Sequence, residues 1–235
     1  MQHCIVSKST VRREGTSLIC LTLKSELCLT VLCRAMTDPM KKSGFWFLTL
    51  GNDSETVVAT VESSLSGLCY SLLSARKREV LAEVSVCPQL TPNPVSFTLV
   101  LSPPSTGIQD ILAGVGVSCT SYSALEEQPH GYAEAKAAGV DVRFLTRAPI
   151  YNSETRSFLH NFGSRVKKAD NHNFVIISGN TLELTKEEAV QMVHLRFGQL
   201  NNNEWILDYR PESIDHLVAM SCVAASLTSK TLCPL

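Results

Sequence analysis

The sequence predicts a mainly β fold: a closed antiparallel β-barrel of about twelve strands around a central buried α-helix near the carboxyl terminus. Short segments rich in β-branched and aromatic residues recur along the chain, with turn signals between them. No long helical patterns are interleaved with them, which argues against a βαβ fold. The stretch LVAMSCVAASL, residues 217–227, carries no charge and has no polar face. Such a helix is buried on every side or lies in a membrane.

The strands can be assigned in chain order from their β-branched and aromatic content. They are predicted at 17–24, 27–33, 45–50, 56–63, 69–74, 80–86, 95–101, 140–146, 174–178 and 204–209. Weaker candidates near Cys4, Ser157 and Val193 bring the total to about twelve.

Two segments interrupt this pattern. Residues 102–139 are rich in Gly, Ser and Pro, and we expect a long, partly helical excursion there. In LTKEEAVQMVHLRFG, Thr185 and Glu188 have capping-box spacing, yet VHLRF alternates like a strand. We therefore expect a short helix or turn at 185–190, and then a strand from Val190 or Gln191 to Phe197.

The apolar stretch near the end is expected to be a core helix. A membrane span needs roughly 20 apolar residues, and Asp215 and Lys230 bracket fewer. Pro211 is typical of a helix entrance, and Asp215 lies where the helix dipole favours a negative charge. Small side chains would let strands approach the helix closely: Ala219, Ser221, Ala224, Ala225 and Ser226.

Composition limits the classes of function. The chain has 235 residues, of which 44% are hydrophobic, so it can form one sizeable core, and we expect a single domain over 1–235 and a monomer. A net charge of −1 argues against a nucleic-acid partner. Lys8, Arg12 and Arg13 interrupt the first apolar patch, so we expect no secretory signal and a cytoplasmic protein.

No pattern indicates catalysis, a metal or a cofactor. The nine cysteines include no C-x-x-C pair, and Cys28 and Cys33 have no downstream partner pair, so we expect reduced, mostly buried thiols and no metal. Residues 114–118, GVGVS, lack the serine-nucleophile and phosphate-loop patterns. His194 and His216 are expected to pack or to form hydrogen bonds. We expect no enzyme and no cofactor.

The carboxyl-terminal third resembles the tubby C-terminal domain, in residues 148–176, 195–213 and 226–233. The matching residues are Asn161, Phe162, Arg165, Val166, Asn173, Phe174, Phe197, Gly198, Asp208, Tyr209, Ser229, Lys230 and Cys233. Residues 56–74 and 78–86 are similar to strands earlier in that domain. The resemblance implies a closed antiparallel barrel around a hydrophobic helix and leaves no room for a second domain.

The resemblance also implies a binding site for phosphoinositide headgroups, which animal-type members form from one Lys and two Arg. In this chain Thr60 replaces the Lys, Glu62 replaces the first Arg, and Arg78 matches the second. Cations suit a bisphosphate headgroup because Arg can bind phosphate with two hydrogen bonds. A Glu at position 62 would instead repel phosphate.

Other cations surround the matching position. Arg76 and Lys77 precede Arg78, and Lys41 and Lys42 lie where related proteins have a basic loop. We predict that these five residues hold an anionic membrane surface weakly, although such charge runs are commonly solvated turns. Three further basic residues are expected to be solvated surface side chains: Arg165, Lys167 and Lys168.

The resemblance implies a non-catalytic adaptor that binds phosphoinositide membranes and carries membrane proteins, with an unknown protein cargo. Its expected location is cytoplasmic, peripheral at the plasma membrane or at the membrane of a cilium or flagellum. The alternative is a protein-interaction scaffold without the phosphoinositide site, because Thr60 and Glu62 replace the family's cations.

Overall fold

A computed structural model of the chain describes residues 1–10, 17–23, 30–37, 44–50, 57–64, 66–87, 96–102, 142–154, 157–160, 162, 165–166, 168–178 and 192–228. In the described parts of 8–50, in 157–159 and at Thr228 it describes the backbone alone. The statements below concern these residues.

Fourteen strands and one helix are assigned. The strands of the main sheet are β1 (Gln2–Thr10), β2 (Ser17–Leu23), β3 (Thr30–Thr37), β4 (Gly44–Leu50), β5 (Val57–Ser63), β6 (Cys69–Ser74), β7 (Val80–Val86), β8 (Phe97–Leu101), β9 (Val142–Thr146), β12 (Phe174–Ile177), β13 (Val193–Asn201) and β14 (Glu204–Tyr209). The others are β10 (Ile150–Asn152), β11 (Ser157–Leu159) and the helix α4 (His216–Thr228).

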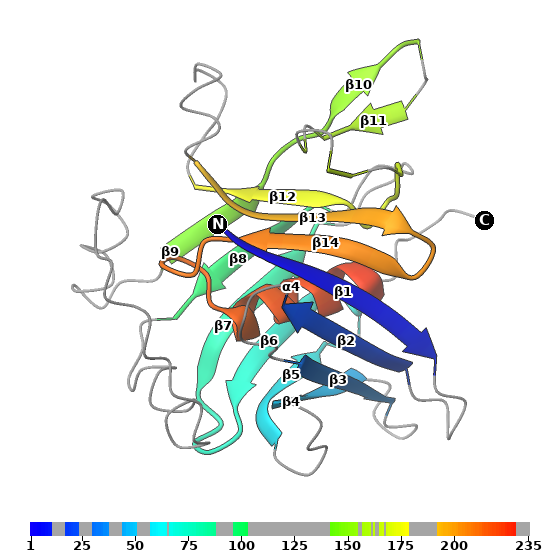
Figure 1. Cartoon of the computed structure of the whole chain (residues 1–235). Coiled ribbons are helices and arrows are strands. Elements are labelled where there is room, and N and C mark those ends of the chain that lie inside the picture. Colours follow the sequence, from blue (N-terminus) through cyan, green and yellow to red (C-terminus); the bar gives the residue numbers. More distant parts are fainter. Residues whose placement is uncertain are drawn as a thin grey trace.

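The main sheet is antiparallel and returns to its starting strand. Its order is β1-β14-β13-β12-β9-β8-β7-β6-β5-β4-β3-β2, a closed barrel, because β1 pairs with both β14 and β2. Figure 1 shows α4 enclosed by these strands, with the hairpin of β10 and β11 projecting away from them. The predicted mainly β, antiparallel fold with a carboxyl-terminal helix is confirmed.

Helix α4 is buried on all its faces. Its exposed fractions are 2% or less from Leu217 to Ala225. The small side chains predicted to admit the strands, Ala219, Ser221, Ala224, Ala225 and Ser226, are all buried. Each large apolar side chain of the helix removed from water contributes about 1.5–3 kcal/mol. The apolar pattern without a polar face therefore reflects a helix that fills the barrel.

The helix begins at His216, later than the entrance predicted at Pro211. The amides of Ser213 and Ile214 donate to the carbonyl of Arg210 at 3.1 and 2.8 Å, which forms a separate turn before the helix. The Asp215 carboxylate then accepts from the amides of Leu217 and Val218 at 2.8 and 2.9 Å. Asp215 is thus the amino-terminal cap, in agreement with its predicted favourable position.

Several predicted boundaries were wrong. The strand predicted at 27–33 is β3, which starts at Thr30 and continues to Thr37, and the strand predicted to begin at Val190 or Gln191 begins at Val193. Strand β10 was not predicted, because three residues before a turn give too short a pattern. The excursion at 102–139, after its first residue, and the helix or turn at 185–190 lie outside the described residues.

The described residues between 160 and 168, here called the outer segment, lie on the outside of the barrel: His160, Phe162, Arg165, Val166 and Lys168. Its Phe162 and Val166 pack in a small apolar cluster with Val175, Ile177 and Val193 of β12 and β13. A Cβ atom at Gly198 of β13 would lie 2.3 Å from Val166 Cγ2. Glycine is required there because the outer segment approaches the strand too closely for a side chain.

The cysteine prediction holds only in part. Among the cysteines whose side chains are described, Cys4 and Cys222 are buried, whereas Cys69 and Cys87 are exposed, and all four are free thiols. Burial raises the pKa of the Cys4 thiol to about 12, so it packs as an apolar side chain. Among the described residues, no helix is long and apolar enough to cross a membrane.

Candidate functional site

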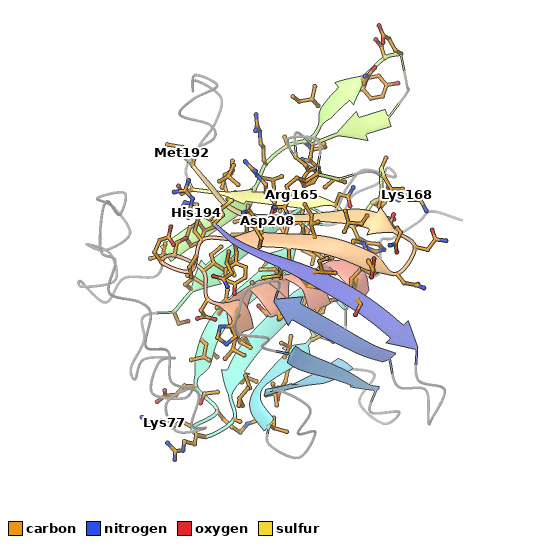
Figure 2. The ribbon with its side chains drawn as sticks, viewed as in Figure 1. Lys77, Arg165, Lys168, Met192, His194 and Asp208 are labelled. Carbon is orange, nitrogen blue, oxygen red and sulfur yellow. The ribbon has the colours of Figure 1, made fainter. Side chains whose placement is uncertain are left out.

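The predicted cations Arg76, Lys77 and Arg78 lie in the turn between β6 and β7. Their side chains are exposed, and backbone hydrogen bonds from Ser74 N to Glu79 O (2.9 Å) and from Arg78 N to Ser74 O (2.8 Å) close the turn. Arg78 has a φ of 55°, in the left-handed region that residues other than glycine rarely adopt. The turn therefore presents three adjacent cations at one end of the barrel, where Figure 2 labels Lys77.

Glu62 neutralises the cation that matches the family pattern. Its Oε1 lies 2.5 Å from Nη2 of Arg78, and the two side chains are 29% and 66% exposed. Glu62 reaches Arg78 because it lies on the outer face of β5, next to the core residue Val61. Glu62 therefore weakens the predicted site in two ways: it replaces one of the family's cations, and it forms an ion pair with Arg78.

The other predicted members of this site do not complete a pocket among the described residues. Thr60 is buried, with 8% exposure, so it offers little surface to a ligand. Lys41 and Lys42 lie outside the described residues. Arg76 and Lys77 are exposed on the turn. This geometry suits a weak contact with an anionic surface that salt can screen.

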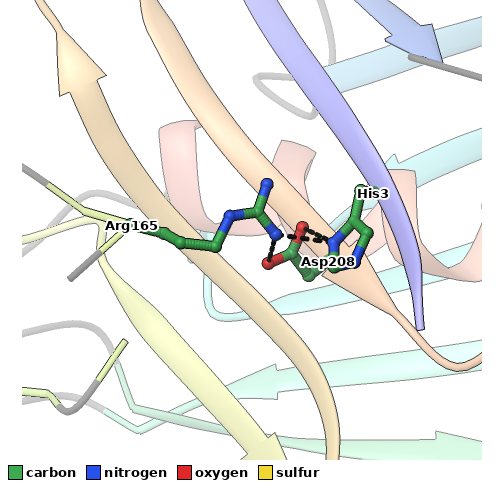
Figure 3. A network of polar contacts seen from close by, with 3 residues as sticks. All are labelled: His3, Arg165 and Asp208. Atoms are coloured by element: carbon green, nitrogen blue, oxygen red, sulfur yellow. Dashed lines mark hydrogen bonds and ion pairs between the residues drawn. The ribbon is translucent and has the colours of Figure 1, made fainter. Parts of the chain in front are cut away.

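A second polar site lies on the outer face of the barrel around Asp208. Asp208 follows the core residue Leu207 and so faces outward, yet its side chain is only 1% exposed. Its Oδ2 accepts a hydrogen bond from Nη1 of Arg165 at 2.5 Å, and its Oδ1 lies 2.8 Å from Nδ1 of His3 (Figure 3). Arg165 belongs to the outer segment, so the ion pair fixes this segment to β14.

The prediction of surface solvation holds only in part for Arg165. It is 41% exposed, but its guanidinium compensates a buried carboxylate. Lys168 is exposed, as predicted, and its Nζ donates to Oδ1 of Asn202 at 2.7 Å. Lys167 lies outside the described residues. The sequence could not show that Arg165 forms an ion pair whereas Lys168 contacts no carboxylate among the described residues, because only the fold brings residues 165 and 208 together.

Arg196 is a charged residue at this site that sequence reasoning missed. It lies directly opposite Asp208 in the pairing of β13 with β14. Burial lowers the pKa of its guanidinium, and the Asp208 carboxylate raises it. The sequence held one indication that Arg196 points outward. Apolar and polar side chains alternate along β13, and Leu195 and Phe197 on either side of Arg196 belong to the core.

His194 is held in a buried hydrogen-bonded position. Its Nδ1 lies 2.7 Å from Oγ of Ser213 and its Nε2 lies 2.9 Å from Oγ of Ser178. The Ser213 hydroxyl donates to the carbonyl of Arg210, so it accepts from Nδ1–H, and Nε2 then accepts from Ser178. Burial, and then the charge of Arg210, lower the pKa of His194 to about 4. The predicted hydrogen-bonding role of His194 is confirmed.

Acid is expected to destabilise the protein partly through His194. Because its pKa is about 4 in the folded state and 6.5 otherwise, the unfolded state binds the proton at higher pH. Stability contributed by the neutral ring is present above pH 6.5 and is lost as the pH falls towards 4, on the order of 3 kcal/mol. Urea unfolding at several pH values should show this slope, and His194→Asn should flatten it. Equal slopes for both proteins would contradict the prediction.

Within the described part of the chain, His, Cys, Asp and Glu side chains form no group of three or more that could hold a metal ion. The described carboxylates do not contact His194 through any hydrogen bond or ion pair, so the arrangement differs from a serine–histidine–acid triad. The described side-chain contacts at the two polar sites are ion pairs and hydrogen bonds.

Comparison with family models gives a match to the Tub family over residues 48–214. This range covers well over half of the chain and includes the turn that carries Arg78, the outer segment and Asp208. No curated protein sequence matches the chain.

Proposed function

Because the chain belongs to the Tub family, we propose that it is a non-catalytic adaptor that attaches peripherally to membranes containing phosphoinositides. Membership in this family favours a lipid-binding protein that is not an enzyme. The adaptor would carry membrane proteins, including those of cilia or flagella, and would act as a monomeric single domain at the plasma or ciliary membrane.

The observation that carries this proposal is the exposed cationic turn between β6 and β7. Arg76 and Lys77 stand beside Arg78, at the position where the resemblance places a headgroup-binding Arg. A basic residue near an anionic leaflet contributes about 1 kcal/mol. Glu62 pairs with Arg78, so the exposed side chains of Arg76 and Lys77 would add to the attraction, and the contact would depend strongly on salt.

The ion pair between Glu62 and Arg78 also supports a second candidate, a scaffold for other proteins that no longer binds the lipid. A neutralised Arg78 and a buried Thr60 leave little of the family's headgroup site. In that case the turn would be a solvated part of a protein-interaction surface.

Vesicle co-sedimentation should separate these candidates. Vesicles with phosphatidylinositol 4,5-bisphosphate, with phosphatidylserine at equal total charge, or with neutral lipid alone would be compared at two salt concentrations. Arg76→Gln combined with Lys77→Gln should weaken binding to the bisphosphate vesicles by about 2 kcal/mol, roughly 30-fold.

The matched control combines Arg143→Gln with Lys168→Gln, two exposed cations outside the turn. It removes the same charge and should leave binding nearly unchanged. If both double variants weaken binding equally, the attraction to the vesicles depends on the total charge of the protein and not on the turn. If the wild-type protein binds none of the vesicles, the adaptor proposal is wrong and the scaffold remains.

A further inference from the structure

Arginines collect on the outer face of the barrel, far from the β6–β7 turn. Asp208 pairs in register with His3 of β1 on one side and with Arg196 of β13 on the other. Arg196 is in turn opposite Val175 of β12, whose carbonyl accepts from the amide of Arg147 at 2.7 Å. Five neighbouring segments therefore place His3, Asp208, Arg196, Val175 and Arg147 in one row across the sheet.

Two more arginines adjoin this row. Arg165 covers it from the outer segment and pairs with Asp208. Arg210 follows β14, and its amide donates to the carbonyl of His194 at 2.9 Å. The charges of Arg165, Arg210 and Arg147 all act on Arg196 and lower the pKa of its guanidinium. Each of these three guanidinium groups is thus near enough to Arg196 to interact with it.

The carboxylates described here compensate only part of this charge. Asp208 is the acidic group whose charge raises the pKa of Arg196, and its oxygens already contact Arg165 and His3. Among the described residues, the guanidinium groups of Arg147, Arg196 and Arg210 take part in no ion pair. Mutual repulsion of such groups is unfavourable, and an anion would relieve it.

Buried polar atoms at this face lack partners among the described residues. Nε of Arg196 is buried without a hydrogen bond, and so are both ring nitrogens of His160, where the outer segment begins. The charge of Arg147 also acts on His160. Buried donors of folded proteins are nearly always satisfied by protein, water or an ion. An anion at this face would provide an acceptor for Nε of Arg196 and for a ring N–H of His160.

We propose that Arg147, Arg196 and Arg210, together with His160, form an anion site for a phosphate-bearing ligand. Guanidinium groups bind phosphate oxygens with paired, charge-assisted hydrogen bonds. The ion pair with Asp208 holds Arg165 and the outer segment in place beside the site. The ligand is either a phosphorylated lipid headgroup or a soluble compound with a phosphate group.

The site can be tested with inorganic pyrophosphate by isothermal titration calorimetry. Arg147→Gln should raise the Kd by about tenfold, because one charged hydrogen-bond donor is lost. The control Arg143→Gln removes an exposed cation from the same part of the chain, β9, and should change the Kd by less than about twofold. Wild-type protein without measurable binding, or equal weakening in the two variants, would overturn the proposal.

An independent measurement uses the ring of His160 in NMR spectra recorded against pH. Burial, and then the charge of Arg147, lower the pKa of His160 to about 4 in the free protein. A bound anion favours the protonated ring, so saturating pyrophosphate should raise the pKa of His160. An unchanged pKa at saturation would show that the anion binds elsewhere. Arg196→Gln, checked for cooperative unfolding, is a second variant that should abolish the shift.

Repeating the vesicle assay with Arg147→Gln distinguishes a lipid headgroup from a soluble phosphate compound as the ligand. Weaker binding to the bisphosphate vesicles, together with weaker pyrophosphate binding, assigns the site to a lipid headgroup. Unchanged vesicle binding together with weaker pyrophosphate binding assigns it to a soluble compound. Arg76 and Lys77 are unchanged in this variant. A loss of vesicle binding by Arg147→Gln therefore tests the anion site separately from the proposed membrane contact of the β6–β7 turn.

Discussion

Glu62→Arg is expected to raise the affinity for vesicles containing phosphatidylinositol 4,5-bisphosphate by about 30-fold, roughly 2 kcal/mol. The change removes the carboxylate that lies 2.5 Å from Nη2 of Arg78 and so frees this guanidinium for phosphate. It also restores the Arg that the resemblance places at position 62. Because both side chains reach the surface, the added repulsion with Arg78 is weakened by solvent and costs little stability.

Co-sedimentation at two salt concentrations measures this gain. Glu154→Arg, in the β10–β11 hairpin, makes the same charge change at an exposed position away from the turn. If the gain is specific to the turn, the affinity for the bisphosphate vesicles should rise strongly for Glu62→Arg and only slightly for Glu154→Arg. Equal gains in both variants would mean that only total charge matters. No gain in either would favour the protein-interaction scaffold.

Asp208→Asn is expected to lower the free energy of unfolding by about 3 kcal/mol. The carboxylate is almost completely buried, and it is the acidic group that contacts Arg165 and adjoins Arg196. Its neutralisation leaves clustered guanidinium groups without a counter-charge and weakens the attachment of the outer segment. The estimate stands at the lower end of values for buried pairs because Arg165 is 41% exposed.

Urea unfolding measures this loss, with Glu154→Gln as the control. This control neutralises an exposed carboxylate and should change stability by less than about 0.5 kcal/mol. Combining Asp208→Asn with Arg165→Gln should cost less than the two single changes added together, because the residues act as a pair. Strictly additive effects would show that the ion pair contributes nothing of its own. Salt should partly restore the single Asp208→Asn variant by screening the arginines.

Local pattern was sufficient to predict most of the fold. The strands β5, β6, β7 and β14 lie within one residue of their predicted bounds, because each is a short, largely apolar run between clear turn signals. The apolar stretch before Lys230 was correctly interpreted as a core helix. Errors occurred where the pattern is short, as in β10, or where a turn shifts a boundary, as before His216.

The sites were less predictable because they depend on pairs that are distant in sequence. The sequence identified Arg78 and noted that Glu62 replaces a cation, but the contact between them arises from the turn after β6. It assigned Arg165 to solvent, although the residue compensates a carboxylate on β14. Arg147, Arg196 and Arg210 each look isolated in the sequence, and strand pairing brings them near one another.

The sequence by itself determined the β-rich class, the apolar helix and the resemblance to one family, since side-chain periodicity and ordered motifs are local properties. Only the tertiary structure decided which charges meet. Strand order and register set these distances, and the energy between two charges depends on distance and burial rather than on separation along the chain. For that reason the pairing of Glu62 with Arg78 and the arginine-rich face around Asp208 became visible only in the folded barrel.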